Sequence, residues 1–377
     1  MAAENSTWIE QGWDPAAWGR RMDRRYQVQD RDTGQWRYFG DLFRKSPAQQ
    51  KYARCVIREV RRGGPVRIIV LKGRKAGITT VACNFKYDVT TNVPGSYAGV
   101  LAHKKDSTNI VFRMVESFWR RTPAEFRPQM RAKNRTTMEF GTRYIEQLES
   151  DEDSLDSIYE CATAGGDNPF TAGTPRLIHI SEGGKMPGDN ERQSQLLTSV
   201  LNAVPTNGPS LVTMEGTAQG WGNMFHKTWL QAEDNVRNGR RPDPGEWIPV
   251  FVGWQDDPLN QMAPSPDYRW DNWDPIDIKR EKHLLRTYFD DDFSVAAPYL
   301  RWRRFKLQEL KDSDRFDEEY PHCPEVAFLR SGRPAIPPAS MDYLADLAGE
   351  PTTTYGASLE DVDDEAFGMS AVHWGDP

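Results

Sequence analysis

Short apolar runs alternate with longer segments of helical periodicity through much of the chain. Four runs have the length and composition of buried strands, namely residues 66–71, 97–102, 176–182 and 210–215. The clearest helices are predicted to begin at Ser46, which precedes a proline at the first helical position, near Thr79 and at Asp106. Apolar strands that alternate with helices predict a mostly parallel α/β sheet covered by helices on both faces.

The remaining segments have less regular patterns. Residues 1–40 are polar and rich in Trp and Arg, which predicts either a docking arm or a loosely packed cap. Residues 149–156 form an acidic stretch that we expect to be a solvated loop, and residues 256–292 are rich in Asp, Pro and Trp and predict irregular structure. A second helical region is predicted over 297–310, and the prolines of 331–355 are typical of a linker.

Composition narrows the class of protein. The chain has 377 residues, of which 38% are hydrophobic and 27% charged, values typical of a soluble globular protein. No apolar run is long enough to cross a bilayer, and the first five residues lack the features of a signal peptide. The four cysteines are widely spaced and indicate reduced cytosolic thiols. With a net charge of −7, any contact with DNA must be made by a local basic patch.

The strand at 66–71 runs into a segment with the features of a phosphate-binding loop. In the common pattern, Gly-x4-Gly-Lys-[Ser/Thr], backbone N–H groups and the lysine bind phosphates while the hydroxyl contacts Mg²⁺. Here Ile78 occupies the lysine position and Lys72 the position of the first glycine. A lysine at the start of the loop can still reach a phosphate. The predicted ATP-binding residues of the loop are Lys72, Gly73, Arg74, Lys75, Ala76, Gly77, Ile78, Thr79 and Thr80. The alternative is a basic surface turn after an edge strand.

Two later strands end in polar residues of the kind that an ATPase needs. The strand at 176–182 ends in Ser181 and Glu182, where Glu182 would activate water and Ser181 would hold a magnesium-bound water in place of the usual Asp. The strand at 210–215 leads into Glu215, Gly216 and Thr217, a segment suited to sensing the γ-phosphate. A strand that simply ends in two polar residues and a plain strand-to-loop corner are the alternatives, but three such endings in the required order favour an ATPase.

In this order the motifs resemble those of the ATPase domain of the large terminase subunit of tailed double-stranded DNA bacteriophages. The residues around Gln49 resemble its adenine-side glutamine motif, residues 67–80 its deviant Walker A motif and residues 179–182 a Walker B variant. Residues 215–225 resemble its coupling motif, and segments between 251 and 332 resemble its lid region. The resemblance covers roughly residues 40 to 335.

The resemblance implies a phosphate-loop NTPase fold of the additional-strand, catalytic-glutamate type with a small helical lid. It divides the chain into an N-terminal arm (1–40), an ATPase core (41–292), a lid (293–345) and a linker (346–377). It implies ATP and Mg²⁺ as ligands, with Glu182 and Lys72 catalytic, Thr79 and Ser181 near the metal, and Glu215 to Thr217 in coupling. The implied partners are viral double-stranded DNA, a portal protein, a small terminase subunit and further copies of the chain in a ring, in the host cytoplasm.

The chain also departs from that family. The residue before Gly173, where an arginine finger is often found, is Ala172, so Arg143 and Arg176 are alternative candidates. The nuclease domain of the family has no counterpart before Pro377, so no nuclease activity is expected. Two other functions remain open: a helicase-like DNA translocase, and an adaptor that binds nucleotide without hydrolysing it.

Overall fold

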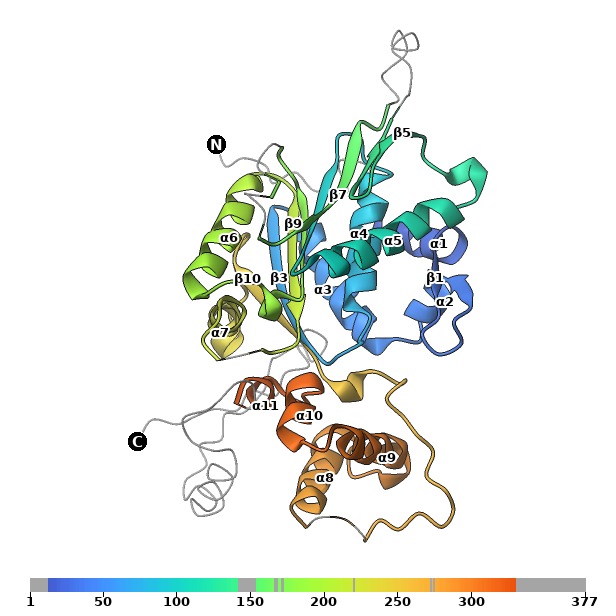
Figure 1. Ribbon diagram of the computed structural model, residues 1–377, viewed down its shortest axis with the longest axis vertical. Coiled ribbons are helices and arrows are strands. Elements are labelled where there is room, and N and C mark those ends of the chain that lie inside the picture. The colour runs from blue at the N-terminus through green and yellow to red at the C-terminus, as the bar shows by residue number, and fades with distance from the viewer. Residues whose placement is uncertain are drawn as a thin grey trace. The chain divides into compact units, whose positions relative to one another are not determined.

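The computed structural model describes residues 13–141, 154–165, 169–170, 173–219, 221–271, 273 and 275–329. Its centre is an eight-stranded sheet with the order β10-β3-β9-β8-β4-β7-β6-β5 (Figure 1). The strands are β3 (Pro65–Lys72), β4 (Tyr97–Ala102), β5 (Met130–Lys133), β6 (Thr137–Phe140), β7 (Ser157–Thr163), β8 (Leu177–Ser181), β9 (Ser210–Gly216) and β10 (Trp247–Val252). The pairs from β10 to β7 are parallel, whereas β6 pairs antiparallel with both β7 and β5.

Helices cover both faces of this sheet, as the sequence pattern predicts (Figure 1). One face carries α3 (Pro47–Arg62), α4 (Ile78–Thr90) and α5 (Lys105–Arg121), and the other carries α6 (Asn190–Ala203) and α7 (Met224–Val236). The side chains of β3 show how one strand serves both layers. Ile68 and Val70 belong to the core on the α3–α4 side, whereas Ile69 and Leu71 belong to the core on the α6–α7 side. This alternation follows from the two-residue period of a strand.

The strand order confirms the predicted fold class. β9 lies between β3, which leads into the loop, and β8, which ends in Ser181. An inserted strand at this place is the feature of the catalytic-glutamate type that the motifs resemble. The chain therefore has an α/β phosphate-loop NTPase fold with a mostly parallel sheet.

The first described residues pack into the core, so the expectation of a docking arm or loose cap is wrong for residues 13–28, whereas residues 31–38 are exposed. This segment contains α1 (Pro15–Arg24), the hairpin of β1 (Gln27–Gln29) and β2 (Trp36–Tyr38), and the start of α2 (Phe39–Phe43). Trp13 and Trp18 are fully buried, and their indole N–H groups donate hydrogen bonds to Asp88 and Asn84 of α4. The segment is thus part of the core on the α4 side.

A third core lies in the helical region after β10. It is built by α8 (Pro275–Tyr288), α9 (Phe293–Leu310) and α10 (Ser313–Glu319), whereas Ala327 and Phe328 of α11 (Pro324–Leu329) belong to the core on the α6–α7 side. Trp254, Trp302 and Phe316 pack together in this core. The prediction of irregular structure over 256–292 is wrong for residues 275–288, which form α8. Residues 251–252, which in the sequence resemble the lid region, are the end of strand β10.

Two adjacent arginines of α9, Arg303 and Arg304, have structural roles. Arg304 forms a buried ion pair with Glu281 of α8, and Arg303 pairs with Asp277. Short 3-10 turns complete the described elements: η1 (Ala124–Phe126), η3 (Gly183–Lys185), η4 (Arg237–Gly239) and η5 (Trp254–Asp256). None of the helices in the described ranges has both the length and the apolar composition needed to span a membrane.

Candidate active site

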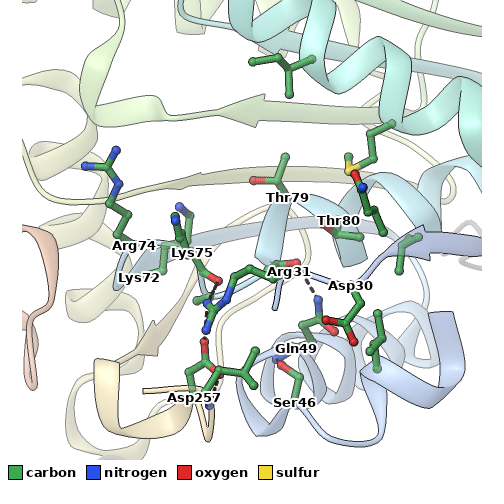
Figure 2. Close-up of a pocket in the computed structure, with 18 of the residues that line it drawn as sticks. Asp30, Arg31, Ser46, Gln49, Lys72, Arg74, Lys75, Thr79, Thr80 and Asp257 are labelled. Atoms are coloured by element: carbon green, nitrogen blue, oxygen red, sulfur yellow. Dashed lines mark hydrogen bonds and ion pairs between the residues drawn. The ribbon is translucent and has the colours of Figure 1, made fainter. Parts of the chain in front are cut away.

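The predicted site residues meet at the carboxyl end of the parallel strands. Lys72 ends β3, Ser181 ends β8, and Glu215 is the penultimate residue of β9. Because parallel strands present these ends at one edge, side chains far apart in sequence converge there. A cavity of about 1160 Å³ opens beside the loop and is lined by Lys72, Thr79, Glu182 and Thr217, among others (Figure 2).

The loop between β3 and α4 has the backbone of a tight turn. Gly77 has a φ of +74°, and a Cβ at this position would lie 2.4 Å from Nε2 of Gln49. The same Nε2 donates a hydrogen bond of 3.0 Å to the Gly77 carbonyl (Figure 2). Gln49 of α3 therefore supports the loop, while its Oε1 is buried and has no hydrogen-bond donor within the described part of the chain. Ile78 is fully buried in the core, so its position cannot present a side chain to a phosphate.

Lys72 is the cation at the centre of the site. Its side chain is 6% exposed, and Nζ lies 3.1 Å from Oε1 of Glu182 and 3.2 Å from Oε2 of Glu215. Burial alone would lower the pKa of Lys72, but the two carboxylates, Glu215 first, raise it above its ordinary value. The ammonium is therefore charged at neutral pH and is held by both acids.

Glu215 is fully buried and contacts four side chains of the site, namely Lys72, Thr79, His179 and Ser181. Its Oε1 accepts hydrogen bonds from Thr79 Oγ1 at 2.8 Å and Ser181 Oγ at 2.9 Å, and His179 Nε2 lies 3.3 Å away. Burial would raise the pKa of Glu215, but the Lys72 ammonium and these donors hold it well below its usual range. The side chain is therefore ionised at neutral pH and contacts Thr79 in the first turn of α4.

Glu182 lies at the mouth of the site on a strained backbone. Its φ and ψ are +57° and +51°, in the left-handed region that side chains other than glycine rarely adopt. Its Oε2 pairs with Lys185 Nζ at 2.9 Å. Burial would raise the pKa of Glu182, but the positive charge of Lys72 lowers it below the usual value, so this acid is also ionised. An ionised carboxylate beside the cavity can accept a proton from water.

The segment predicted to couple the site to movement packs against the turn that carries Glu182. A Cβ at Gly184 would lie 2.7 Å from the Thr217 carbonyl oxygen, and one at Gly216 would lie 3.2 Å from the Gly183 nitrogen. Thr217 itself is buried and lines the cavity. A displacement of residues 216–217 would therefore push directly on the backbone that positions Glu182.

The other two cations predicted to hold phosphates are placed differently. Arg74 pairs with Glu319 of α10 at 3.2 Å, and its backbone N–H donates to the Glu319 carbonyl, so the side chain is engaged with the helical region. Lys75 is exposed, has a φ of +63°, and its carbonyl accepts a hydrogen bond from Arg31 (Figure 2). All three cations line the cavity, but of the three Lys72 alone lies against the two acids, and the expectation that all three hold phosphates stays a prediction.

Sequence reasoning missed several residues of the site. His179 and Lys185 contact the two acids, and Arg31 joins the loop to Asp257 through an ion pair of 3.2 Å. For His179 a signal existed, since it stands two residues before Ser181 on the same face of an otherwise apolar strand. Arg143 and Ala172 lie outside the described residues, and Arg176 precedes β8.

Comparisons with known proteins give matches among solved structures alone: no protein-family model and no curated protein sequence matches. The large terminase ATPase domain of Thermus phage P74-26 is 16% identical, with 67% of this chain and 86% of that chain covered and a TM-score of 0.39. The HK97 bacteriophage large terminase is 15% identical, with 75% and 54% covered and a TM-score of 0.44. A large terminase from a thermophilic bacteriophage is 10% identical, with 59% and 44% covered and a TM-score of 0.32. These structures are of the class that the motifs resemble, but at such identities and TM-scores the roles of residues depend on the geometry of this chain.

Proposed function

We propose that this chain hydrolyses ATP, with Mg²⁺ bound to the nucleotide as the substrate. The observation that supports this most directly is the convergence of Lys72, Glu182 and Thr79 at the carboxyl edge of the sheet beside one cavity. These three groups supply a cation for phosphate, a base for water and a hydroxyl for the metal. They are the parts that catalysis of phosphoryl transfer requires.

Lys72 is the proposed phosphate-binding cation. A lysine binds phosphate as a point charge on a flexible stem, so Nζ can leave the carboxylates when a more highly charged triphosphate enters the cavity. The backbone N–H groups of residues 73–79 then surround the phosphates, and Gln49 supports this loop from α3. Arg74 and Lys75 remain further candidates for phosphate contacts, provided that Arg74 leaves Glu319.

Glu182 is the proposed general base. Its carboxylate is ionised, lies at the cavity and is held by Lys72 and Lys185 on opposite oxygens. When Lys72 moves to the phosphates, Oε1 becomes free to accept a proton from the attacking water. Proton transfer of this kind commonly contributes about a hundredfold or more to rate.

An adaptor that binds nucleotide without hydrolysing it is the second candidate. The observation in its favour is that Lys72 is already neutralised by two carboxylates, as in a site that serves only structure. Glu182 argues against an adaptor that only binds nucleotide. Its left-handed backbone costs free energy, and such strain is typical of residues with a catalytic or binding role, here an ionised acid that faces a cavity.

For the biological role we propose translocation of viral double-stranded DNA into a procapsid. The order of the motifs along the chain supports this role, together with the contact between residues 216–217 and the turn of Glu182, through which phosphate release can move the structure. On this proposal the chain acts as a ring bound to a portal protein, with a small terminase subunit as a further partner. A helicase-like translocase would share the hydrolysis site, and packaging of DNA into procapsids distinguishes the two.

Steady-state release of phosphate, with and without double-stranded DNA, tests the proposal. Glu182→Gln should lower turnover at least about a hundredfold while a fluorescent ATP analogue still binds with near wild-type affinity. Glu246→Gln is the matched control, because this partly exposed acid pairs with Arg240 far along the sequence from the site. Binding without any turnover in the wild type, or full turnover in Glu182→Gln, would contradict the assignment.

A further inference from the structure

Strand β8 ends without the acid that usually accompanies a catalytic glutamate. Ser181 stands at that position, and its hydroxyl brings no negative charge to a metal. In the register of the sheet, Ser181 is paired with Glu215 of the neighbouring strand β9. The two side chains are hydrogen-bonded, with Ser181 donating at 2.9 Å. A carboxylate is therefore present beside the expected place, on the adjacent strand.

Glu215 also contacts the residue of the loop that is expected to meet the metal. Thr79, the second residue of α4, donates its hydroxyl proton to Glu215 Oε1 at 2.8 Å. A hydroxyl that donates to a carboxylate directs its oxygen lone pairs away from it, which suits binding of a cation on the other side. Mg²⁺ is usually bound by one or two carboxylates, water and the phosphates of a nucleotide, and the groups here fit that pattern.

The cation already present in the site supports the same conclusion. The Lys72 ammonium lies within 3.2 Å of oxygens of both Glu182 and Glu215. Glu215 Oε2 is buried and has no hydrogen-bond donor among the described residues, so it faces this ammonium as an ion pair. A buried carboxylate without a cation is strongly unfavourable, so a departing Lys72 must be replaced by another positive charge.

We propose that Glu215 is the metal-associated carboxylate of this site, taking the role that Ser181 cannot fill. The proposal depends on the function proposed above, since the metal arrives with the nucleotide. In the absence of nucleotide, Lys72 provides the charge that balances Glu215. When MgATP binds, Lys72 engages the phosphates and Mg²⁺, held through Thr79 and Glu215, takes over that balance. Glu215 is thus assigned to the metal in addition to the coupling role expected from sequence.

The test is the effect of Mg²⁺ on nucleotide affinity, which requires no turnover. A fluorescent non-hydrolysable ATP analogue is titrated into the purified chain in Mg²⁺ and in EDTA, and the ratio of the two dissociation constants is the readout. In Glu215→Gln the gain from Mg²⁺ should fall by about 10–100-fold, the usual effect of losing a group that supports a metal ligand. Ser181→Ala should lower the ratio less than Glu215→Gln does, because it removes one of the donors that orient Glu215 and leaves the carboxylate itself in place.

A double variant provides the decisive control. Ser181→Asp with Glu215→Gln moves the carboxylate back to β8 and preserves the negative charge beside Lys72, so it should fold even if Glu215→Gln does not. We expect it to restore the Mg²⁺ ratio to within about tenfold of the wild type. Glu59→Gln is the matched buried variant, since this acid pairs with Arg58 and Arg62 on α3, and it should leave the ratio unchanged.

The outcomes separate this inference from the proposed function. If the wild type binds the analogue with a clear gain from Mg²⁺ and Glu215→Gln keeps that gain, the assignment of Glu215 is wrong while ATP binding stands. If the double variant folds but shows no gain, the carboxylate acts only as a structural partner of Lys72. If the wild type binds no nucleotide in either condition, both proposals are overturned.

Discussion

Replacing Asp88 by Asn should release the N-terminal segment from α4. The Asp88 carboxylate is fully buried and accepts hydrogen bonds from Trp13 Nε1 at 2.7 Å and from the Tyr26 hydroxyl at 2.6 Å. Arg21 binds it through Nε and Nη2, both at 2.6 Å. Three residues of the segment thus depend on one side chain of the core.

The expected loss of stability in Asp88→Asn follows from the donors that lose their acceptor. Asparagine has one carbonyl oxygen, so it can satisfy only part of these donors, and its amide N–H₂ would face the Arg21 guanidinium. The Arg21 side chain is 13% exposed, so it loses its counter-charge in a largely dry place. Breaking such a pair costs about 3–5 kcal/mol, and each further hydrogen bond to a charged group adds about 1.5–3 kcal/mol where its donor stays unpaired. We expect a loss of at least about 3 kcal/mol.

Urea unfolding followed by tryptophan fluorescence measures this loss, because Trp13 and Trp18 are buried in the segment. Asp14→Asn is the control: Asp14 is the N-cap of α1, is half exposed, and asparagine caps helices equally well. Nucleotide affinity should also fall in Asp88→Asn, since Val28, Arg31 and Trp36 of the segment line the cavity. A change in stability below about 1 kcal/mol, the worth of one ordinary hydrogen bond, would refute the reasoning.

Three further predictions concern other parts of the chain. Lys72→Ala should weaken ATP-analogue binding at least about tenfold, and adding Ile78→Lys should not restore it, because Ile78 is buried in the core; recovery in equilibrium titrations of the double variant would show that the loop can use the usual position. Burial raises the pKa of Glu233 to about 7, so the folded carboxyl retains a proton that the unfolded chain releases above its ordinary value of 4.5. Stability is therefore lost as the pH rises from 4.5 to 7, and Glu233→Gln should raise the melting temperature by a few degrees at pH 8 and leave it unchanged at pH 4, while an equal gain at both would contradict the shift. Glu281→Gln should destabilise the helical region by about 3–5 kcal/mol by leaving Arg304 without its buried partner, seen as faster hydrogen exchange in α8 and α9 with β3 unaffected; uniform exchange across the chain would argue against a separate core.

The central strands of the sheet could be predicted from the sequence because they are buried on both faces. Such strands form continuous apolar runs, and 66–71, 97–102 and 210–215 agree with β3, β4 and β9 to within about one residue. The peripheral strands were harder to predict. β10 contains Pro249, which argues against a strand except at an edge, and β10 is indeed the edge strand beside β3.

The packing of the N-terminal segment could not be predicted for a different reason. A segment rich in Trp and Arg is typical of a surface arm unless its polar groups have buried partners. Here Trp13 and Trp18 donate to Asp88 and Asn84, which lie 75 and 66 residues away in sequence. Asn84 in the middle of α4 and Asp88 near its end carry no local signal that they will accept these hydrogen bonds.

For the site, the sequence predicted correctly which residues lie close together, but it did not predict the individual contacts of each residue. Lys72, Thr79, Ser181 and Glu182 were expected together, and the structure places them within hydrogen-bond or ion-pair distance of one another or of Glu215. The central position of Glu215 was not expected, since it depends on the register between β8 and β9. An alternating pattern of polar residues was the available signal, with His179 and Ser181 on one strand and Thr213 and Glu215 on the next.

This alternation places a buried polar layer beneath the site, on the side of the sheet that α4 covers. Thr213 accepts a hydrogen bond from Lys86 at 3.0 Å and shares one of 2.7 Å with Tyr52. Burial lowers the pKa of His179, so its neutral ring donates from Nε2 to Glu215 and accepts at Nδ1 from the Cys83 thiol, 3.3 Å away. These partners are all buried. Among them His179 contacts Glu215 Oε1, as Thr79 and Ser181 also do, whereas Lys72 faces Oε2.

Glu182 is held differently, because its contacts are Lys72 and the partly exposed Lys185 on a short turn. Of the two acids that contact Lys72, Glu215 is therefore held more firmly than Glu182. Entry of a nucleotide that draws Lys72 away leaves Glu215 in place, since buried donors orient it, whereas Glu182 loses its main constraint and can turn toward water. On the proposed function, this difference provides a fixed acid for the metal and a movable acid for the attacking water. In this chain the difference follows from the contacts of the two side chains, since buried donors orient Glu215 whereas two lysines hold Glu182.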